Sequence, residues 1–539
     1  MNIPTAAVLL FATAWPQFGH DAQHTGAVTT TAQPMQIVLA SVQMDPFVSL
    51  EEAFYGEDLL VHYATPIVDG DDVFIAVKSG TFTPGDWSTQ RWGVQALRWQ
   101  GGRLVARWTT MSDWRPVPQT TGGPTFEPVF QPVLANGFIY MPGMAMHLIR
   151  VDPNSGAIID YPGAFPTLIL GAYITSPLVT DATGNIYYNV IFLNVNAWTN
   201  DVRDAWLERI APDGSSKIAQ YSAFVTGAPA GTDACLGAFS DADLPWPPSP
   251  TAVPPNIICG SQRPGINVAP AIATDGTIYT VSRAHFNSRY GYLIALNPDL
   301  TPKWTQSLRD RLNDGCNVTL PQNGAPGGCR AGAFTGVDPA DNTMGAGRVF
   351  DDSSSSPLIA PDGSVFYGAY TRYNYSQGHL MHFTQTGAYL GAYPFGWDIT
   401  PGIYAHDNTY SIISKENRYP VGTYCDNPVT CPVVRNQAYF VTALDPSLHV
   451  QWSMSAPRGF EWCINGPAID GNGVSYVNSE DGWLYSINPD GTLRQSIQLT
   501  AAIGQAYTPV VVDDRGRVYA EKAGMLFVVG ARPRVRAVR

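Results

Sequence analysis

Two histidines flank an aspartate in the stretch "WPQFGHDAQHTG", residues 15–26, which also carries a tryptophan and a phenylalanine. His20 and His24 are four residues apart, so on a helix they would share one face and could bind a metal ion or take part in acid–base catalysis. No helical pattern of apolar residues surrounds them. We therefore expect the stretch to lead structurally into a strand at residues 35–42, with a histidine site as the open alternative.

Other polar clusters are explained by backbone geometry. His379 and His382 are three residues apart in an apparent strand, where they point to opposite faces. The Asp-rich turns at 69–72, 351–352 and 513–514 lack the spacing of a calcium-binding loop and suit tight turns instead. No nucleophile-elbow, zinc-protease or phosphate-loop motif occurs. We expect neither a metal site nor a catalytic residue from these clusters.

Six of the seven cysteines fall as near neighbours in three stretches. Local pairing would join Cys235 to Cys259, Cys316 to Cys329 and Cys425 to Cys431, and such disulfides favour an oxidising compartment. Connectivity stays open, because six cysteines allow 15 pairings. Metal binding is disfavoured because no C-x-x-C occurs. We expect the seventh cysteine, Cys463, to be a buried free thiol.

Composition excludes several classes of protein. The net charge is -13 and charged residues make up 14%, so a nucleic-acid partner is not expected. We expect the basic tail at 531–539 to be a frayed end.

Residues 1–14 resemble the later part of a secretory signal, although no basic region precedes them, so the true N-terminus is open. No later stretch has the length of a membrane span. We expect an exported, periplasmic or extracellular monomer.

An internal repeat predicts the fold. A proline, a few apolar or small residues, an Asp/Asn/Gly turn and an aromatic residue, as in "TPIVDGDDVF", recur eight times. This phrase describes two strands around a hairpin turn. The prolines of the eight copies are Pro66, Pro132, Pro177, Pro270, Pro357, Pro401, Pro467 and Pro509.

A second two-strand phrase follows seven of the copies, as in "YLIALNPDLTPKW". Four antiparallel strands in each of eight units predict an all-β, eight-bladed β-propeller over residues 15–530. The last unit ends early, at "MLFVVG". We expect an N-terminal strand to supply its missing fourth strand and close the ring.

Spacing between the prolines locates the insertions. Counting the strands of each blade as A to D, insertions fall between B and C or between D and the next A. They lie at 78–92, 109–125, 222–265, 305–350 and 411–438. In an up-and-down sheet both kinds of connection emerge on the same side, so we expect the extra sequence to gather on one face, over the mouth of the central channel. Long loops on a rigid scaffold commonly carry binding sites.

The repeat resembles a known family. The phrase from Ala295-Leu296-Asn297 to Trp304, with its copy from Ala443-Leu444-Asp445 to Trp452, is similar to the repeat of pyrroloquinoline-quinone-type (quinoprotein-like) propellers. The resemblance implies the propeller fold. It also implies a choice of function, because the family includes quinone-dependent dehydrogenases and non-catalytic members. The paired cysteines of the alcohol dehydrogenases and a C-x-x-C-H haem motif do not occur in this sequence.

Aromatic and charged residues near the insertions are the candidate ligand-binding residues, because such mixtures suit carbohydrate, peptide or protein recognition. They are Trp87, Trp92, Trp246, Arg330, Trp397, Asp398, His406 and Trp462. The alternative is that these tryptophans pack loops onto the propeller. We interpret the chain as a binding or scaffold module rather than an enzyme, with no cofactor. The leading alternative is a periplasmic oxidoreductase of alcohols or sugars that uses pyrroloquinoline quinone and calcium, and a hydrolase using loop carboxylates is a third class.

Overall fold

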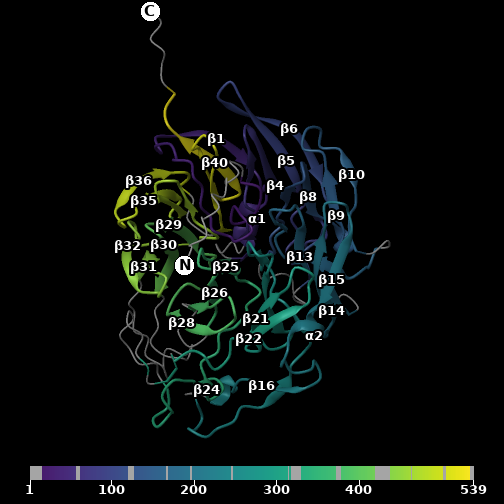
Figure 1. Cartoon of the computed structure of the whole chain (residues 1–539), viewed down its shortest axis with the longest axis vertical. Coiled ribbons are helices and arrows are strands. Elements are labelled where there is room, and N and C mark those ends of the chain that lie inside the picture. Colours follow the sequence, from purple (N-terminus) through teal and green to yellow (C-terminus); the bar gives the residue numbers. More distant parts are fainter. Residues whose placement is uncertain are drawn as a thin grey trace, which may run out of the picture.

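The computed structural model describes residues 15–55, 61–118, 127–164, 168–194, 197–243, 247–313, 315–316, 318, 329–371, 378–418, 438–462, 464–501 and 506–533. Eight four-stranded antiparallel sheets stand around a central axis, and Figure 1 views the ring along that direction. The predicted eight-bladed propeller is confirmed. Two strand A segments, in blades 3 and 4, are each divided in two.

Blades 1 to 4 each contain strands A to D in chain order. Blade 1 comprises β3 (Ile67–Asp69), β4 (Asp72–Gly80), β5 (Gln90–Gln100) and β6 (Arg103–Met111). Blade 2 comprises β7 (Val133–Ala135), β8 (Phe138–Pro142), β9 (Leu148–Val151) and β10 (Ile158–Asp160). Blade 3 comprises β11 (Ala172–Ile174), β12 (Val179–Thr180), β13 (Ile186–Leu193), β14 (Val202–Ile210) and β15 (Ser216–Gln220). Blade 4 comprises β18 (Gln262–Pro264), β19 (Ala271–Ile272), β20 (Ile278–Ala284), β21 (Gly291–Leu296) and β22 (Pro302–Ser307).

Blades 5 to 8 each contain strands A to D as well. Blade 5 comprises β25 (Leu358–Ile359), β26 (Val365–Ala369), β27 (His379–Phe383) and β28 (Tyr389–Tyr393). Blade 6 comprises β29 (Gly402–His406), β30 (Thr409–Arg418), β31 (Ala438–Leu444) and β32 (Val450–Ser455). Blade 7 comprises β33 (Ala468–Ile469), β34 (Ser475–Asn478), β35 (Trp483–Ile487) and β36 (Leu493–Gln498). Blade 8 comprises β38 (Val510–Val512), β39 (Val518–Lys522), β40 (Met525–Gly530) and β1 (Ile37–Gln43).

A few short elements lie outside the blades. They are the parallel pair β2 (Val61–His62) and β37 (Ala506–Tyr507), the hairpins β16 (Ala234–Leu236) with β17 (Asn256–Ile258) and β23 (Val337–Asp338) with β24 (Thr343–Met344), the helices α1 (Val48–Tyr55) and α2 (Tyr221–Phe224), and the 3-10 turns Met144–Met146 and Asp241–Asp243. None of the described helices is long and apolar enough to cross a membrane.

The repeated turn phrase is a local hydrogen-bonding unit. In blade 8, one carboxylate oxygen of Asp513 accepts bonds from the backbone N–H groups of Arg515 and Arg517, at 2.9 and 2.8 Å. Its other oxygen accepts the hydroxyl of Tyr519 at 2.9 Å. The aspartate therefore shapes the A–B turn and also anchors the aromatic residue of strand B, which is why the two recur together in the sequence.

Ring closure follows the predicted route. The N-terminal strand β1 pairs antiparallel with β40, from Ile37 against Gly530 to Gln43 against Met525. It is therefore strand D of blade 8. The strand ends at Gln43, one residue beyond the predicted end at 42.

Tryptophans at the outer strands join neighbouring blades. The indole N–H of Trp304 donates to the carbonyl of Gln385 at 2.9 Å, so strand D of blade 4 is tied to the C–D turn of blade 5. A methyl group on Gly387 would lie 2.8 Å from that ring. Trp108 and Trp452 make the same kind of bond to the next blade. The Trp at the end of the repeat phrase is thus an inter-blade contact.

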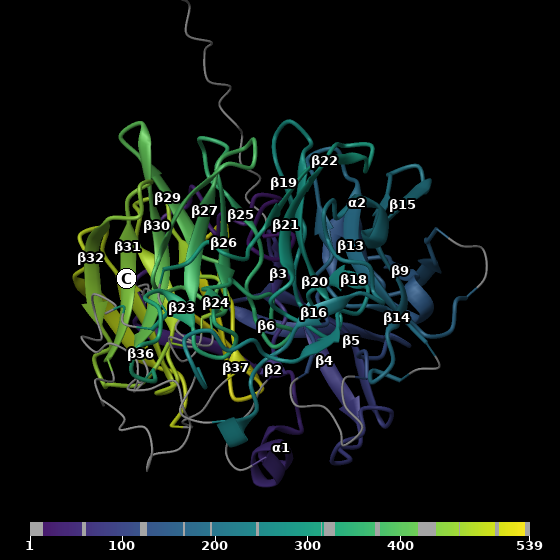
Figure 2. The ribbon, with the colours of Figure 1, turned by 90° about the horizontal axis from the view of Figure 1, so that it is seen from below.

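The long connections emerge on one side of the disc, which we call the loop face, and the tight A–B turns lie on the other, the turn face. Figure 2 shows α1, β2, β37 and the far ends of β4 and β5 on the loop face, with the β29–β30 turn opposite. Several strands extend further than the sequence predicts. Strands β4 and β5 occupy much of 78–92, and β30 takes up the start of 411–438.

Candidate functional site

Residues 15–33, which we call the closing ring, run around the channel at the turn face and bond to every blade in order. In six blades the backbone N–H two residues after the proline of the repeat donates to a ring carbonyl, at 2.7 to 3.0 Å. The donors are Val68, Leu134, Ile272, Ile359, Ile403 and Ile469, and their acceptors are Trp15, Pro16, Ala22, Gln23, Thr25 and Gly26. In blade 3 the side chain of Gln17 bonds to Thr180, and in blade 8 the N–H of Gln33 donates to Gly516.

The opening histidines belong to this ring. His20 and His24 are buried, and both take a left-handed backbone conformation. One ring nitrogen of His24 lies 2.8 Å from the carbonyl oxygen of Pro357, and burial lowers the pKa of His24 to about 4, so the imidazole is neutral near pH 7. The geometry of the stretch is that of a seal packed against the blades, as the structural interpretation of the sequence expects.

At the loop end of the channel, one lysine is surrounded by three carboxylates. The ammonium of Lys78 lies 2.6 Å from Asp45, 2.5 Å from Glu127 and 3.5 Å from Glu51. We call these four residues the lysine pocket. All four side chains are buried, and they come from β4, α1 and the chain segments leading into blades 1 and 2. Burial alone would lower the pKa of Lys78, but the carboxylates outweigh it and raise that pKa, so the amine is charged.

Replacing Glu51 by Gln should stabilise the protein at high pH. Burial raises the pKa of Glu51 from 4.5 to about 8. A carboxyl with a raised pKa contributes full stability below pH 4.5 and loses it as the pH rises toward 8. The neutral amide escapes this loss, so we expect Glu51→Gln to match the native chain at pH 5 and to exceed it by about 2 kcal/mol at pH 8. Urea unfolding at both pH values measures the difference.

The control is Glu52→Gln, which makes the same chemical change at the next residue of α1, where the side chain is only half-buried. Its effect should stay small at both pH values. If the Glu51→Gln variant is less stable than the native chain at pH 8, the conclusion that burial raises the pKa of Glu51 in the lysine pocket is contradicted.

His62 lies at the centre of the channel near the lysine pocket. Its imidazole faces the backbone of Glu127 and of Asp352, and it is close enough to Asp398 and Lys415 to feel their charges. His62 precedes blade 1, Glu127 precedes blade 2 and Asp352 precedes blade 5. Asp398 and Lys415 precede and belong to blade 6, respectively, so the imidazole reaches across the channel. Burial lowers the pKa of His62 to about 4. Burial and then the charge of Asp398 raise the pKa of Asp352 to about 7.

A neutral imidazole beside a carboxyl that titrates near pH 7 has the chemistry of an acid–base pair. The space beside it is small, however. The cavity that His62 lines together with Lys78, Trp92 and Glu127 measures about 20 Å³, which is room for one water molecule. The described residues around His62 therefore leave no room there for a substrate.

The two insertions with disulfides fold against each other into one body, which we call the insertion unit (the described parts of 225–261 and 308–347). Cys235 pairs with Cys259 and Cys316 with Cys329, the pairings that the sequence suggests. The N–H of Phe239 donates to the carbonyl of Ala340 at 2.8 Å, which joins one insertion to the other.

Polar groups hold the insertion unit from inside. The amide of Asn342 donates to three carbonyls of the other insertion, those of Ser249, Pro250 and Ala252, at 2.9, 3.1 and 3.0 Å. Arg289, from blade 4, forms a 2.8 Å ion pair with Asp341. The unit is therefore fixed to the propeller and not a loose pair of loops.

The insertion unit projects from the rim of the disc. Figure 1 shows β16 and β24 outside the ring of blades, beyond β22 and β28. The sequence instead predicts that these insertions lie over the channel mouth. The difference arises because a D–A connection begins at the outermost strand of its blade, so a long insertion starts at the rim.

The fold of the chain is similar to the folds of solved structures. A europium-containing methanol dehydrogenase matches with a TM-score of 0.53 and 11% identity, over 94% of this chain and 89% of that one. The quinohemoprotein alcohol dehydrogenase from Comamonas testosteroni matches with a TM-score of 0.51 and 12% identity, over 98% and 82%. BamB from Moraxella catarrhalis matches at a TM-score of 0.40 and 14% identity, over 93% and 99%. No protein-family model and no curated protein matches the chain.

The eight blades and these two matches above a TM-score of 0.5 decide the fold. In fold, the chain is an eight-bladed β-propeller similar to those of the two dehydrogenases. The identities of 11% and 12% carry the likeness no further than the fold.

The described residues at the loop end of the propeller do not form a site that fits a quinone and calcium. No three His, Cys, Asp or Glu side chains are grouped so that they could hold a metal ion within the described ranges. The cavity of about 20 Å³ is also far below the few hundred Å³ of an ordinary small-molecule pocket.

Two of the candidate ligand-binding tryptophans are core residues of the propeller. Trp92 and Trp462 are almost fully buried. The indole N–H of Trp92 donates to Glu127 at 2.8 Å, and the ring of Trp462 packs edge-on against Tyr485. The alternative interpretation, that these tryptophans pack the loops, describes both. Trp87 is half-buried at the β4–β5 tip, against the core of blades 1 and 2.

Among the described residues, the remaining candidates lie in separate parts of the fold. His406 ends β29 at an A–B turn, so it lies on the turn face and not near the mouth, where the sequence places it; its ring nitrogen is 2.9 Å from Ser411. Arg330 belongs to the insertion unit and donates to the carbonyl of Pro247 at 3.0 Å. Trp397 packs edge-on against Tyr370, whereas Asp398 accepts the N–H of Ser354 at 2.7 Å near the channel.

Some sequence predictions fall outside the described residues. These are Trp246, the Cys425–Cys431 pair, Cys463, the leader at 1–14 and the tail beyond 533.

The ionisable residues at the loop end were missed by motif searching. A signal for part of the set exists, because Lys78, Lys415 and Lys522 each follow the aromatic residue of strand B by three to five positions. A lysine in that position is a candidate for a buried ion pair. No such pattern marks His62.

Proposed function

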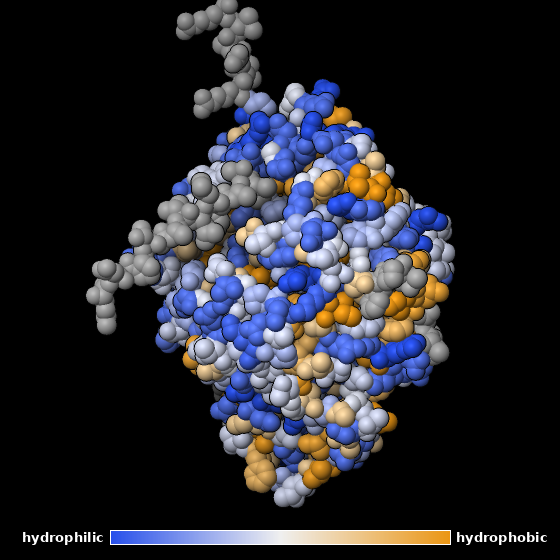
Figure 3. Space-filling view, turned by 45° about the vertical axis from the view of Figure 1, so that its right-hand side comes forward, coloured by the Kyte–Doolittle hydropathy of each residue, from blue (hydrophilic) through white to orange (hydrophobic). Residues whose placement is uncertain are grey.

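We propose that the chain is an exported binding or scaffold module that recognises a protein, peptide or carbohydrate through the insertion unit. The observation that carries this proposal is a fixed projection with apolar side chains at its surface. Val253, Ile258 and Phe334 are 75%, 60% and 56% exposed. Figure 3 shows the narrow lower end of the molecule, where hydrophobic residues lie among hydrophilic ones.

Rigid presentation of apolar side chains favours binding. Exposed apolar groups on a soluble protein commonly mark contact sites, and ordering costs are lower when the surface is held in place beforehand. The disulfides, the Asn342 bonds and the Arg289 ion pair supply that rigidity here. Two disulfides also support export, because such bonds persist in oxidising compartments.

The test is an unbiased selection. A displayed peptide library and a glycan array are exposed to the native chain and to a triple variant, Val253→Ser, Ile258→Ser and Phe334→Ser. We expect ligands that bind the native chain and lose at least tenfold in affinity for the variant.

A matched control carries Leu390→Ser, Val450→Ser and Leu493→Ser, which remove side chains that are 57%, 47% and 45% exposed from the outer strands of blades 5, 6 and 7. This control should keep the ligands. The absence of any ligand from both collections, or ligands that bind all three proteins alike, refutes the proposal.

A quinone-dependent oxidoreductase is the second candidate, and the fold likeness to two dehydrogenases is the observation that favours it. The test is reconstitution with pyrroloquinoline quinone, calcium and an electron-acceptor dye. We expect no dye reduction that depends on an alcohol or a sugar. Substrate-dependent reduction would replace the proposed binding function.

A further inference from the structure

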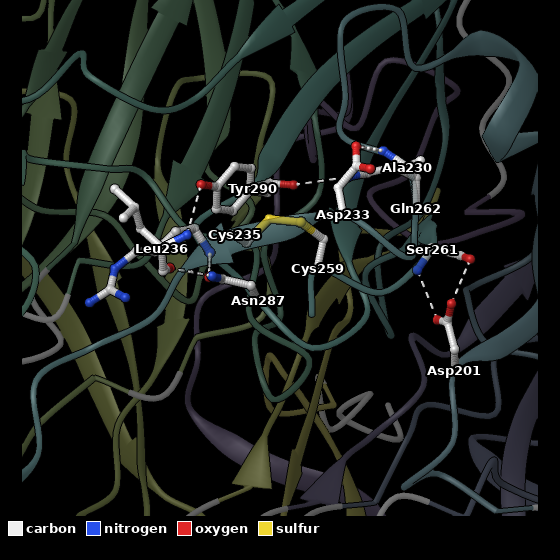
Figure 4. Close-up of a disulfide and its surroundings, with 11 residues drawn as sticks. Asp201, Ala230, Asp233, Cys235, Leu236, Cys259, Ser261, Gln262, Asn287 and Tyr290 are labelled. Atoms are coloured by element: carbon white, nitrogen blue, oxygen red, sulfur yellow. Dashed lines mark hydrogen bonds between the residues drawn. A yellow bond between two sulfur atoms is a disulfide. The ribbon is translucent and has the colours of Figure 1, made fainter. Parts of the chain in front are cut away.

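The hairpin β16–β17 has one edge bonded to the propeller and one edge open. The N–H of Leu236 in β16 donates to the hydroxyl of Tyr290 at 3.2 Å, and the side chain of Asn287 donates to the carbonyl of Leu236 at 2.7 Å. Figure 4 shows both bonds beside the disulfide of Cys235 and Cys259. The edge formed by β16 is therefore satisfied by blade 4.

Strand β17 presents its own backbone groups to solvent. Cys235 lies opposite Ile257, and the neighbouring pairs are bonded through Gly237 with Pro255 and Cys259 with Asp233. The alternation of an antiparallel ladder therefore turns the N–H and C=O groups of Asn256 and Ile258 away from β16. Within the described residues β17 pairs with β16 alone, and all three of its residues are exposed.

Outer strands elsewhere in this protein are protected against strand pairing. Register shifts of the bulge type interrupt seven of them: β1, β6, β10, β22, β28, β32 and β36. The eighth, β15, has a regular register and carries Lys217. Bulges and lysines are the usual means of blocking edge-to-edge association.

Strand β17 has neither protection. Its sequence is Asn-Ile-Ile, its pairing has no register shift, and the disulfide and the bonds of Ser261 to Asp201, both 2.8 Å, fix its base. An open, apolar and immobilised edge among eight protected ones is a template for another strand.

Charge indicates the kind of partner. Residues 222–262 contain three aspartates, Asp233, Asp241 and Asp243, and no lysine, arginine, histidine or glutamate. A segment with basic flanks would complement this surface.

We propose that β17 binds an extended apolar polypeptide segment with basic flanks, which adds to the hairpin as a third strand. This inference rests on the proposed binding function and names the partner class. The backbone of the segment forms hydrogen bonds with the N–H and C=O groups of Asn256 and Ile258. Apolar side chains on one face of the segment contact the exposed side chain of Ile258.

The experiment uses a fluorescein-labelled peptide, Lys-Lys-Val-Thr-Val-Thr-Val-Lys-Lys, titrated into the full chain and followed by fluorescence anisotropy. We expect saturable binding. The same peptide N-methylated at its five central residues should bind at least tenfold more weakly, because it cannot donate backbone hydrogen bonds. Ile258→Pro, which removes one outward N–H, should weaken binding as much, whereas Val450→Thr on the outer strand β32 should leave it unchanged.

Several outcomes overturn the inference. Equal binding of the methylated peptide shows that side chains, not strand pairing, hold it, and this result needs no protein variant that must fold. A chain that dimerises in solution and becomes monomeric as Ile258→Pro shows that a second copy occupies the edge. If the library yields ligands for the insertion unit while this peptide does not bind, the strand-docking inference fails and the proposed binding function stands.

Discussion

Deleting residues 15–33 should destabilise the propeller by about 5 to 10 kcal/mol, because the closing ring makes one or more hydrogen bonds to each blade and each net bond contributes about 0.5 to 1.5 kcal/mol. The deletion also removes the buried side chains of Trp15, Phe18 and Ala22, so the apolar blade residues that pack against them become exposed. A loss of this size is comparable to the whole stability of many domains. Urea unfolding followed by tryptophan fluorescence measures it.

Addition of a synthetic peptide of residues 15–33 is the control for this deletion. If the ring acts through its contacts with the blades, the peptide should restore part of the lost stability in a concentration-dependent way. An unfolding midpoint that the deletion leaves unchanged would mean that strand β1 alone closes the propeller.

Replacing Lys78 by Met should cost about 3 to 5 kcal/mol at pH 7, because the change removes the cation that faces the buried acidic side chains of Asp45, Glu51 and Glu127. Burial raises the pKa of Glu51 and of Glu127, so these groups take up protons readily once the cation is gone. Part of the loss should therefore be recovered at pH 5. Unfolding in urea at the two pH values gives both numbers.

The comparison for this variant is Lys303→Met. Lys303 is 34% exposed and lies 3.5 Å from the exposed Asp275, and such surface pairs contribute about 1 kcal/mol or less. If both variants lose the same small amount, the lysine pocket is not the buried ion cluster that its distances indicate.

Much of the fold is encoded locally. The turn aspartate and the aromatic residue of strand B, as in Asp513 and Tyr519, meet within six residues, so their pattern is visible in the sequence. Counting the strands of each repeat likewise shows that blade 8 lacks one strand, and β1 supplies it. The two described disulfides follow from short spacings, because residues in one loop can approach without the rest of the chain.

The candidate sites depend on residues far apart in the chain. Glu127 reaches Lys78 across 49 residues, and Asp398 approaches His62 from blade 6, so no local spacing marks them. Tryptophans mislead for a related reason. Trp92 looks like a loop residue until β5 is seen to begin at Gln90, which places its ring in the core.

By itself the sequence determined the eight repeats, the turn chemistry of each blade and the strand that closes the ring, because each depends on residues within a few positions of one another. Only the tertiary structure decided that residues 15–33 seal the turn face, that the insertion unit projects from the rim, and that β17 keeps an open edge. Those features depend on which distant backbone groups find partners, and hydrogen bonding between separate blades leaves no periodic trace in the chain.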